Sequence, residues 1–360
     1  MACFKPYMAK YGPVNPETGK NSIIIGKAFD GDDPKAYDLL KTKSIFLIPC
    51  GKCLGCKLDY ARHWADRMML EFECTHKAVF VTLTYEDKCL PNVSSVTGEL
   101  FSAEDLNADG TRIAPLDKKD MSDFMKRLRS KFVDNGHEEI KPRFFGCGEY
   151  GSEKHRPHLH IILFGVSLED LCIRFRGDIQ GSLEPWVRNE LGQVSYRSNL
   201  LEDVWEEKGI VTVSETSYET FGYVARYSVK KAKGDSYAKD YGLPEEFTSM
   251  SRNPGIGLPF LLEHDIYSSD SWSVKDKKIF WPKILIQKDV VFDINGDPFY
   301  YNRDEDDEFL TFSKEKRSAL ALNTFLNKFE TSSKSYADFQ HDLERNTAER
   351  VSVLKRGDVN

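Results

Sequence analysis

Two patterns of apolar and polar residues alternate along the middle of the chain. Runs of β-branched and aromatic residues, typical of strands, lie at residues 78–85, 141–150, 156–165 and 209–215. Apolar residues at helical spacing predict helices that begin near Asp59, Asp117, Leu201 and Ser217. This mixture of helices and strands predicts one α+β domain, which we expect to occupy residues 58–245.

The helix expected after Asp117 has the clearest pattern. Its apolar stripe consists of Met121, Phe124, Met125, Leu128 and Phe132. Asp117 stands before the stripe, and its side chain can accept a hydrogen bond from the first turn, so we expect it to be the N-cap.

The beginning of the chain has neither pattern. Residues 1–57 are rich in Gly, Pro, Lys and Cys, and we interpret them as a Cys-rich N-terminal segment. The segment is expected to be mainly loop, with one short strand from Ser44 to Ile48.

Residues 246–360 predict a mixed C-terminal region. Asn295-Gly296 stands between two β-prone runs and favours a hairpin. Two amphipathic helices are expected near residues 313–330 and 335–352. Nothing in this region indicates catalysis.

The composition is that of a soluble globular protein with enough length for one large core or two smaller ones. Of the 360 residues, 40% are hydrophobic and 30% are charged. No apolar run approaches the roughly 18 residues that span a bilayer, and the first residues lack the apolar segment of a secretory signal. We therefore expect a cytoplasmic protein with no membrane partner.

The net charge of −7 argues weakly against nucleic-acid binding. The charges are segregated, however. Acidic residues fill positions 304–308, while basic residues gather at 118–131 and 226–239. A local basic surface is enough to hold a phosphate backbone, so nucleic acid stays open as a partner.

Three of the eight cysteines form the motif Cys50-x-x-Cys53-x-x-Cys56. The chain length and the lack of a secretory signal argue against a disulfide scaffold. A two-residue gap places thiolates on one side of a turn, which favours a structural zinc with Cys3 or another residue as the fourth ligand. The alternative is a loop of free thiols.

Two histidines open an apolar run in "GEYGSEKHRPHLHIILFG", residues 148–165. On a strand, His158 and His160 share one face and lie roughly 6.5 to 7 Å apart along the strand, so they can converge on one metal ion. The alternative is that they are polar residues at a sheet surface. A metallo-β-lactamase-like site would need an acid where Ile162 stands, and a cupin-like site would need Glu in place of Leu163 or Phe164.

The remaining pattern, two histidines separated and followed by hydrophobic residues, resembles the HUH nucleases. The upstream run "VFVTLTY" fits that family, and Glu149, expected on the turn before the histidines, fits its third metal ligand. The spacing Tyr223-x-x-x-Tyr227-x-x-Lys230 resembles the two-tyrosine replication initiators of microviruses, most closely the gokushovirus branch. The resemblance is strong from residue 50 to 231 and extends weakly to 250–257.

This resemblance implies the HUH nuclease fold, with a central antiparallel sheet flanked by helices. It also implies a rolling-circle replication initiator: a metal-dependent, site-specific endonuclease that nicks and rejoins single-stranded phage DNA at the origin. The reaction would pass through a 5′-phosphotyrosine and leave a 3′-hydroxyl primer. The substrate would be single-stranded or supercoiled origin DNA in the cytoplasm of the host bacterium, with host helicase and polymerase as candidate partners.

The same resemblance assigns roles to individual residues. The metal ligands would be His158, His160 and Glu149, with Mg²⁺ or Mn²⁺ as the ion. The catalytic residues would be Tyr223, Tyr227 and Lys230. DNA contacts are expected from Arg156, Arg226 and Lys231.

The helix pattern bears on the tyrosines independently. At about 100° per residue, one sector of the helix holds Phe221, Val224, Ala225, Ser228 and Ala232. Tyr223, Tyr227 and Lys230 fall close to the opposite side, away from the predicted core face. Two other functions stay open: a non-enzymatic, zinc-stabilised DNA-binding protein, and an HUH transposase.

Overall fold

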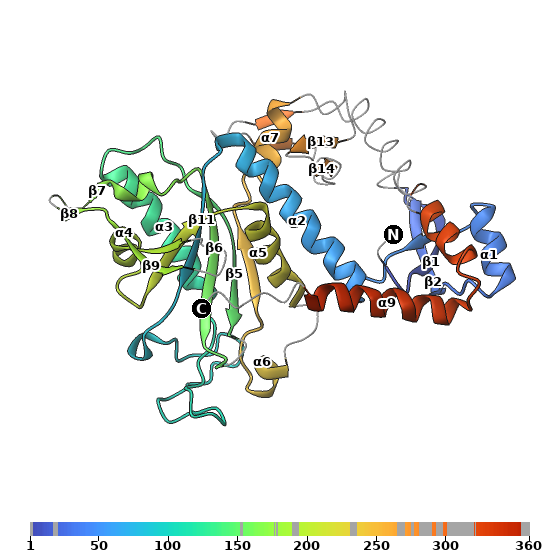
Figure 1. Ribbon diagram of the computed structural model, residues 1–360, viewed down its shortest axis with the longest axis horizontal. Helices are drawn as coiled ribbons and strands as arrows, with labels where there is room; N and C mark the ends of the chain where they lie inside the picture. The colour runs from blue at the N-terminus through green and yellow to red at the C-terminus, as the bar shows by residue number, and fades with distance from the viewer. Residues whose placement is uncertain are drawn as a thin grey trace. The chain divides into compact units, whose positions relative to one another are not determined.

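The structure is a computed structural model (Figure 1). It describes residues 3–16, 21–151, 154–175, 177, 179–188, 194–230, 236–264, 271–274, 277–280, 290–292, 298–300, 320 and 322–353. The chain forms two compact units. The larger unit is Ala61–Arg303, and the smaller unit combines Met1–Tyr60 with Asp304–Asn360.

A seven-stranded sheet forms the centre of the larger unit. Its strands are β4 (Ala78–Leu83), β5 (Arg143–Tyr150), β6 (Pro157–Phe164), β9 (Leu183–Arg188), β10 (Val194–Ser198), β11 (Val211–Glu215) and β12 (Phe247–Met250). The strand order is β12-β5-β6-β4-β11-β10-β9, and every neighbouring pair is antiparallel. The predicted α+β fold with a central antiparallel sheet flanked by helices is confirmed.

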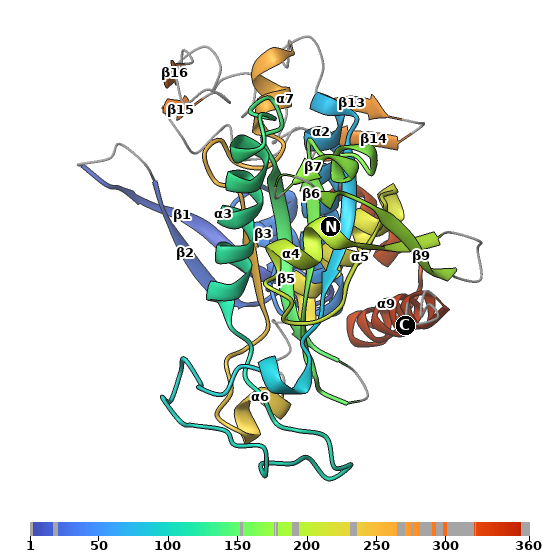
Figure 2. The ribbon, with the colours of Figure 1, turned by 90° about the vertical axis from the view of Figure 1, so that its left-hand side faces the viewer.

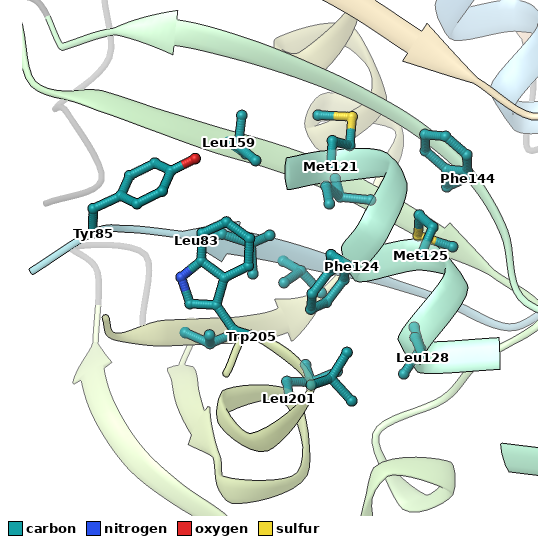
Figure 3. Close-up of a cluster of buried hydrophobic side chains, with 14 of the residues drawn as sticks. Leu83, Tyr85, Met121, Phe124, Met125, Leu128, Phe144, Leu159, Leu201 and Trp205 are labelled. Carbon is teal, nitrogen blue, oxygen red and sulfur yellow. The ribbon is translucent and has the colours of Figure 1, made fainter. Parts of the chain in front are cut away.

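The helices α3 (Lys118–Asp134) and α4 (Asn199–Val204) pack on one face of this sheet (Figures 1 and 3). The expected N-cap is present, because the Asp117 side chain accepts a hydrogen bond of 2.7 Å from the N–H of Lys119. Side chains that alternate along the strands, such as Leu83 and Leu159, bury themselves against Phe124 of α3. Truncating a fully buried phenylalanine such as Phe124 to alanine typically costs about 3 to 5 kcal/mol.

The opposite face of the sheet meets α5 (Tyr218–Lys230) and the part of α2 (Leu54–Thr75) that belongs to the larger unit. The Trp64 ring of α2 lies 5.0 Å from Phe145 of β5, centroid to centroid. Phe221 of α5 lies 5.9 Å from Phe164 of β6. The sheet is therefore the middle of three layers, and each face of a strand meets a different set of helices.

The remaining described elements of the larger unit are short. They are η1 (Asp87–Cys89), η2 (Glu169–Cys172), β7 (Arg174–Phe175), β8 (Ile179–Gln180), α6 (Ser236–Asp240), α7 (Leu258–Glu263), β13 (Ser271–Val274), β14 (Lys277–Phe280), β15 (Val290–Phe292) and β16 (Pro298–Tyr300). Strands β15 and β16 pair antiparallel, as the predicted hairpin requires, and its turn at Asn295-Gly296 lies outside the described residues. Figure 2 shows α6 and the long segment after β4 at one end of the sheet.

The smaller unit contains β1 (Tyr7–Val14), β2 (Asn21–Ala28), α1 (Pro34–Lys41), β3 (Phe46–Ile48) and α9 (Tyr336–Val353). The three strands form an antiparallel sheet of order β2-β1-β3, so the expectation of a mainly looped N-terminus is wrong. The strands escaped the sequence pattern because β2 is exposed along its whole length and has no alternation of buried and exposed positions.

Both ends of the chain contribute to the core of the smaller unit. Phe29, Leu40 and Leu47 pack with Phe325, Tyr336 and Phe339. The predicted C-terminal helix is present as α9. The helix expected at 313–330 is described only at residue 320 and from residue 322 onward, and these positions are helical.

Two helix boundaries differ from the expectation. Helix α2 begins at Leu54, five residues before Asp59, because the end of the cysteine motif forms its first turn. There the N–H of Lys57 donates a 3.1 Å hydrogen bond to the carbonyl of Cys53. Helix α4 begins at Asn199, where the Ser198 side chain accepts from the N–H of Leu201. Among the described helices, none combines the length and the apolar character needed to cross a membrane.

Candidate active site

The two histidines and Glu149 meet through the register of two neighbouring strands. In the β5–β6 pair, Glu149 lies opposite His158, and Cys147 lies opposite His160. Residues directly opposite each other project from the same face of a sheet. Glu149 was expected on the turn before the histidines; it belongs instead to strand β5, and the antiparallel register brings it to them.

The three side chains converge at one point. His158 Nε2 is 2.7 Å from Glu149 Oε1, and His160 Nε2 is 3.0 Å from the same oxygen. The three candidate ligand atoms all lie within 4.8 Å of one another. Exposure of the side chains is 6% for Glu149, 8% for His160 and 20% for His158, so His158 is the most open of the three.

The second nitrogen of each imidazole has its own partner. His158 Nδ1 lies 3.1 Å from the carbonyl oxygen of Arg156, which can only accept, so Nδ1 is the donor. His160 Nδ1 lies 3.0 Å from Thr82 Oγ1 on β4. These bonds orient both Nε2 atoms toward Glu149, as outer partners orient the histidine ligands of a metal.

Thr82 is the one residue of this arrangement that the sequence did not single out. Its strand was recognised as "VFVTLTY", but the choice among its threonines depends on the register. Thr82 lies opposite His160 in the β4–β6 pair, and a strand pattern alone does not give that pairing.

The charge of Glu149 suits a metal ligand. Burial alone would raise its pKa, but hydrogen bonds and charge interactions with His158 and His160 outweigh burial and hold the pKa well below its ordinary value. The carboxylate therefore stays ionised at neutral pH. One carboxylate oxygen with two imidazole nitrogens makes a donor set that suits several divalent ions.

Tyr223 packs directly beside this group. Its ring lies 5.9 Å from the His160 ring and 6.1 Å from the Phe80 ring, while Phe80 stacks on His160 at 5.4 Å. Phe221 and Val224 are buried, whereas Tyr223 is only partly buried. Helix α5 thus brings one of the two predicted tyrosines to a candidate metal ligand.

The other residues predicted on this helix are described less fully. Tyr227 and Lys230 lie on α5, but their side chains lie outside the described residues, as does Lys231 entirely. Arg226 lies on α5 and is partly exposed.

Arg156 already has protein partners. Its Nη1 donates to Asp87 Oδ1 at 2.6 Å, and its Nη2 donates to the carbonyl of Tyr85. Since the side chain is 38% exposed, it links the start of β6 to the segment after β4 and still faces solvent. The neighbouring His155 stacks on Tyr237, with ring centroids 4.1 Å apart and planes 11° from parallel.

A second group of candidate ligands lies in the smaller unit. The sulfur atoms of Cys3, Cys50, Cys53 and Cys56 lie within 4.8 Å of one another. The Cys50–Cys56 and Cys3–Cys53 sulfur distances are both 3.9 Å. A tetrahedral zinc site with Zn–S bonds near 2.3 Å requires sulfur atoms about 3.8 Å apart, so the four thiols fit a zinc ion.

Backbone amides point at these sulfur atoms. The N–H groups of Phe4, Cys50 and Cys53 donate to the sulfurs of Cys53, Cys3 and Cys50. Burial opposes ionisation of Cys50, but hydrogen bonds from the N–H groups of Cys53 and Lys52 lower its pKa to about 7. Burial raises the pKa of Cys3 and Cys56. The loop is therefore shaped to hold thiolate, the form that binds metal.

Comparison with known proteins relates the part of the chain that carries the histidine site to a family of replication proteins. Residues 78–232 match the model of the replication-associated protein ORF2 family. The match runs from β4 to the end of α5, and so includes Thr82, Glu149, both histidines and the two tyrosines.

Three curated phage proteins are similar to the chain. The replication-associated protein ORF2 of Spiroplasma virus 4 is 29% identical over 99% of this chain and 98% of its own length. The replication-associated protein VP4 of Bdellovibrio phage phiMH2K is 30% identical over 56% of this chain and 54% of its own. The replication-associated protein ORF4 of Chlamydia phage 1 is 30% identical over 55% and 42%.

These relatives confirm the predicted relationship to phage replication proteins. The likeness to the Spiroplasma virus protein includes both ends of the chain, and with them the smaller unit. No solved structure matches the chain.

Proposed function

We propose that this protein starts phage DNA replication by nicking and rejoining single-stranded DNA. The observation that carries the proposal is the convergence of Glu149, His158 and His160 on one point, with the Tyr223 ring against His160. Its likeness to phage replication-associated proteins supplies the biological setting. In that setting it acts on origin DNA, single-stranded or supercoiled, in the cytoplasm of the host bacterium.

The triad would hold a divalent ion. Mn²⁺ suits its two imidazoles, while Mg²⁺ prefers oxygen ligands. When bound, the ion supplies polarisation of the scissile phosphate and stabilisation of the developing negative charge. The protein's part is to keep Glu149 ionised and to point both Nε2 atoms at it through Thr82 and the Arg156 carbonyl.

Tyr223 would be one nucleophile and Tyr227 the other. The phenol loses its proton to water, and its oxygen forms a bond to the scissile phosphorus while the bond from phosphorus to the 3′-oxygen breaks. That oxygen leaves with the electron pair and takes up a proton, which gives a 3′-hydroxyl primer and a 5′-phosphotyrosine. With two tyrosines, one can stay attached to a strand end while the other attacks the regenerated origin.

The basic residues on and near α5 would manage the phosphate charge. Lys230 would favour the phenolate and hold phosphate, since an ammonium group stabilises a neighbouring anion. Arg226 and Lys231 would contact the DNA backbone. Arg156 would add a contact through the part of its side chain that faces solvent. Host helicase and polymerase are the proteins expected to use the opened strand and its primer.

The cysteine group would hold a structural zinc ion rather than take part in the reaction. Four thiolates close a tetrahedral site completely and leave no position for a substrate. An iron–sulfur cluster is less favoured, because its usual motif continues with a fourth cysteine followed by proline soon after the run.

The test is covalent capture. The protein is incubated with random single-stranded DNA and Mn²⁺, and denaturing electrophoresis then detects a protein–DNA adduct. We expect Tyr223→Phe and Tyr227→Phe each to keep some cleavage and the double variant to form no adduct. The matched control is Tyr218→Phe on the same helix, whose hydroxyl donates to Asp66 at 3.1 Å.

Each outcome separates the candidate functions. An adduct that persists in the double variant would refute the tyrosine assignment. DNA binding without any adduct would favour the non-enzymatic, zinc-stabilised DNA-binding protein. Strand transfer into unrelated DNA, in preference to religation, would favour the HUH transposase.

A further inference from the structure

A second basic site lies at the far end of strand β5 from the candidate metal ligands. A cavity of about 670 Å³ opens there, lined by α3, by the segment before β5 and by the residues that follow β12. Arg143, at the first position of β5, lines the cavity, and Glu149 lies six residues further along the same strand. At the rise of an extended strand this separation is about 20 Å.

The lining of this cavity is strongly cationic. It contains Arg129, Lys141, Arg143 and Arg252, against Glu138 as its one acidic residue. Arg143 is neutralised by an ion pair with the buried Glu71, and it also donates to the carbonyl of Pro254 at 2.8 Å. The positive charge that faces the cavity therefore comes from the other three cations.

These three cations have no acidic partner among the residues that the structure describes. Arg129, Lys141 and Arg252 form no ion pair there, and all three are exposed. The Nε of Arg129 donates to the carbonyl of Pro142 at 3.0 Å, which fixes the plane of the guanidinium and leaves its outer N–H groups for another acceptor. Desolvation and the nearby charge of Arg143 lower the pKa of Arg129. An anion bound in the cavity would relieve both effects.

We propose that this cavity binds a phosphate group of the nucleic-acid backbone. Two guanidinium groups and an ammonium on one concave surface match the geometry and charge of phosphate, which guanidinium can bind through two parallel hydrogen bonds. Contacts to phosphate fix the position of a strand without reading its sequence. The proposal rests on the proposed function and extends it, because it gives the DNA a second anchor about 20 Å from the point of cleavage.

The test measures binding of labelled single-stranded DNA by fluorescence anisotropy, without added divalent metal, over a series of salt concentrations. The variants are Arg129→Gln, Arg252→Gln and the double substitution. Loss of each phosphate contact should reduce the slope of log affinity against log salt by about 0.7. We therefore expect a reduction of about 0.7 for each single variant and about 1.4 for the double variant.

Lys126→Gln is the matched control. Lys126 lies one turn before Arg129 on α3, is 74% exposed, and does not line the cavity. Its removal should leave the slope as in the wild type. Arg252→Gln covers the case in which Arg129→Gln does not fold, because the side chain of Arg252 makes no hydrogen bond to the rest of the described protein that folding would need.

Inorganic phosphate distinguishes the two sources of such an anion. If phosphate raises the melting temperature of the wild type but not of the double variant, while DNA affinity is the same in both, the cavity binds a free anion and the backbone assignment is overturned. Unchanged DNA affinity and unchanged phosphate response overturn the site altogether. Because no cleavage is measured, these outcomes are independent of adduct formation, which tests the proposed function.

Discussion

The two groups of candidate metal ligands are built in opposite ways. Glu149, His158 and His160 are placed by strand register within the sheet of the larger unit, and they offer two nitrogens and one oxygen. The cysteines come from the N-terminus and from the loop that leads into α2 in the smaller unit, and they offer four sulfurs. Three ligands leave coordination positions free for a substrate, whereas four thiolates leave none. The same closeness of ligand atoms thus serves two purposes, chemistry in one unit and structure in the other.

Replacing a histidine ligand should have the largest effect on activity. His158→Ala should abolish nicking, because it removes the most exposed nitrogen of the triad, while the melting temperature stays within a few degrees of the wild type. Glu149→Gln should lose as much activity or slightly less. Adduct yield and thermal melting measure the two effects.

His155→Ala is the control for this prediction. It removes a histidine three residues away that stacks on Tyr237 and lies outside the triad, so it should keep its cleavage. Wild-type cleavage by His158→Ala would mean that the triad is not the metal site.

Breaking the cysteine site should reverse this pattern. Cys53→Ser should lose bound zinc and lower the stability of the smaller unit by several kcal/mol, because the binding energy of a structural zinc is folding energy. Nicking should persist, because the triad belongs wholly to the larger unit. Metal analysis and a melting curve with two transitions test this.

Cys172→Ser provides the comparison, since this cysteine lies outside the ligand group and should keep both zinc and stability. If the protein purified without chelator contains no zinc and has normal stability, the four cysteines are a loop of free thiols.

A smaller effect is expected from the orientation of His160. Thr82→Val removes the hydroxyl that lies 3.0 Å from His160 Nδ1 and should weaken metal affinity about 10- to 100-fold. Excess Mn²⁺ should restore the rate, and Thr82→Ser should behave like the wild type. A lower rate that no concentration of Mn²⁺ restores would place the effect of Thr82 outside metal binding.

The smallest effect concerns the pH dependence of Cys50. Because its pKa is lowered to about 7, Cys50 should become reactive toward iodoacetamide as pH rises through 7 in protein stripped of metal. A thiol of lower pKa is also a weaker nucleophile, so the gain at pH 7 over an ordinary cysteine is only roughly 5- to 10-fold. Stability from this thiolate is fully present above the unfolded value near 9 and is lost as pH falls through about 7.

Peptide mass spectrometry over a pH series reads this reactivity. Cys3 and Cys56 serve as internal references, because their raised pKa values keep them as thiols at neutral pH. Half-maximal alkylation of Cys50 near pH 9 would mean that the amide hydrogen bonds to its sulfur do not form.

The sequence by itself determined the elements of the larger unit and most of its chemistry. Strong apolar runs and a clean helix stripe are local signals, so β6, α3 and the N-cap at Asp117 could be read directly. The spacing of His158 and His160 fixed their common face, because strand geometry repeats every two residues. The cysteine motif likewise predicted three of the four clustered sulfurs and named Cys3 for the fourth.

Only the tertiary structure decided which distant residues meet. The opposition of Glu149 to His158 and the hydroxyl of Thr82 beside His160 both depend on register, which is set by long-range pairing. The exposed strand β2 has no alternation to read, and its pairing with β1 appears only in the folded chain. Packing of Phe325 and Phe339 with Phe29 joins the two ends of the chain in one core. No local pattern carries that information, because contacts between distant segments depend on the fold of everything between them.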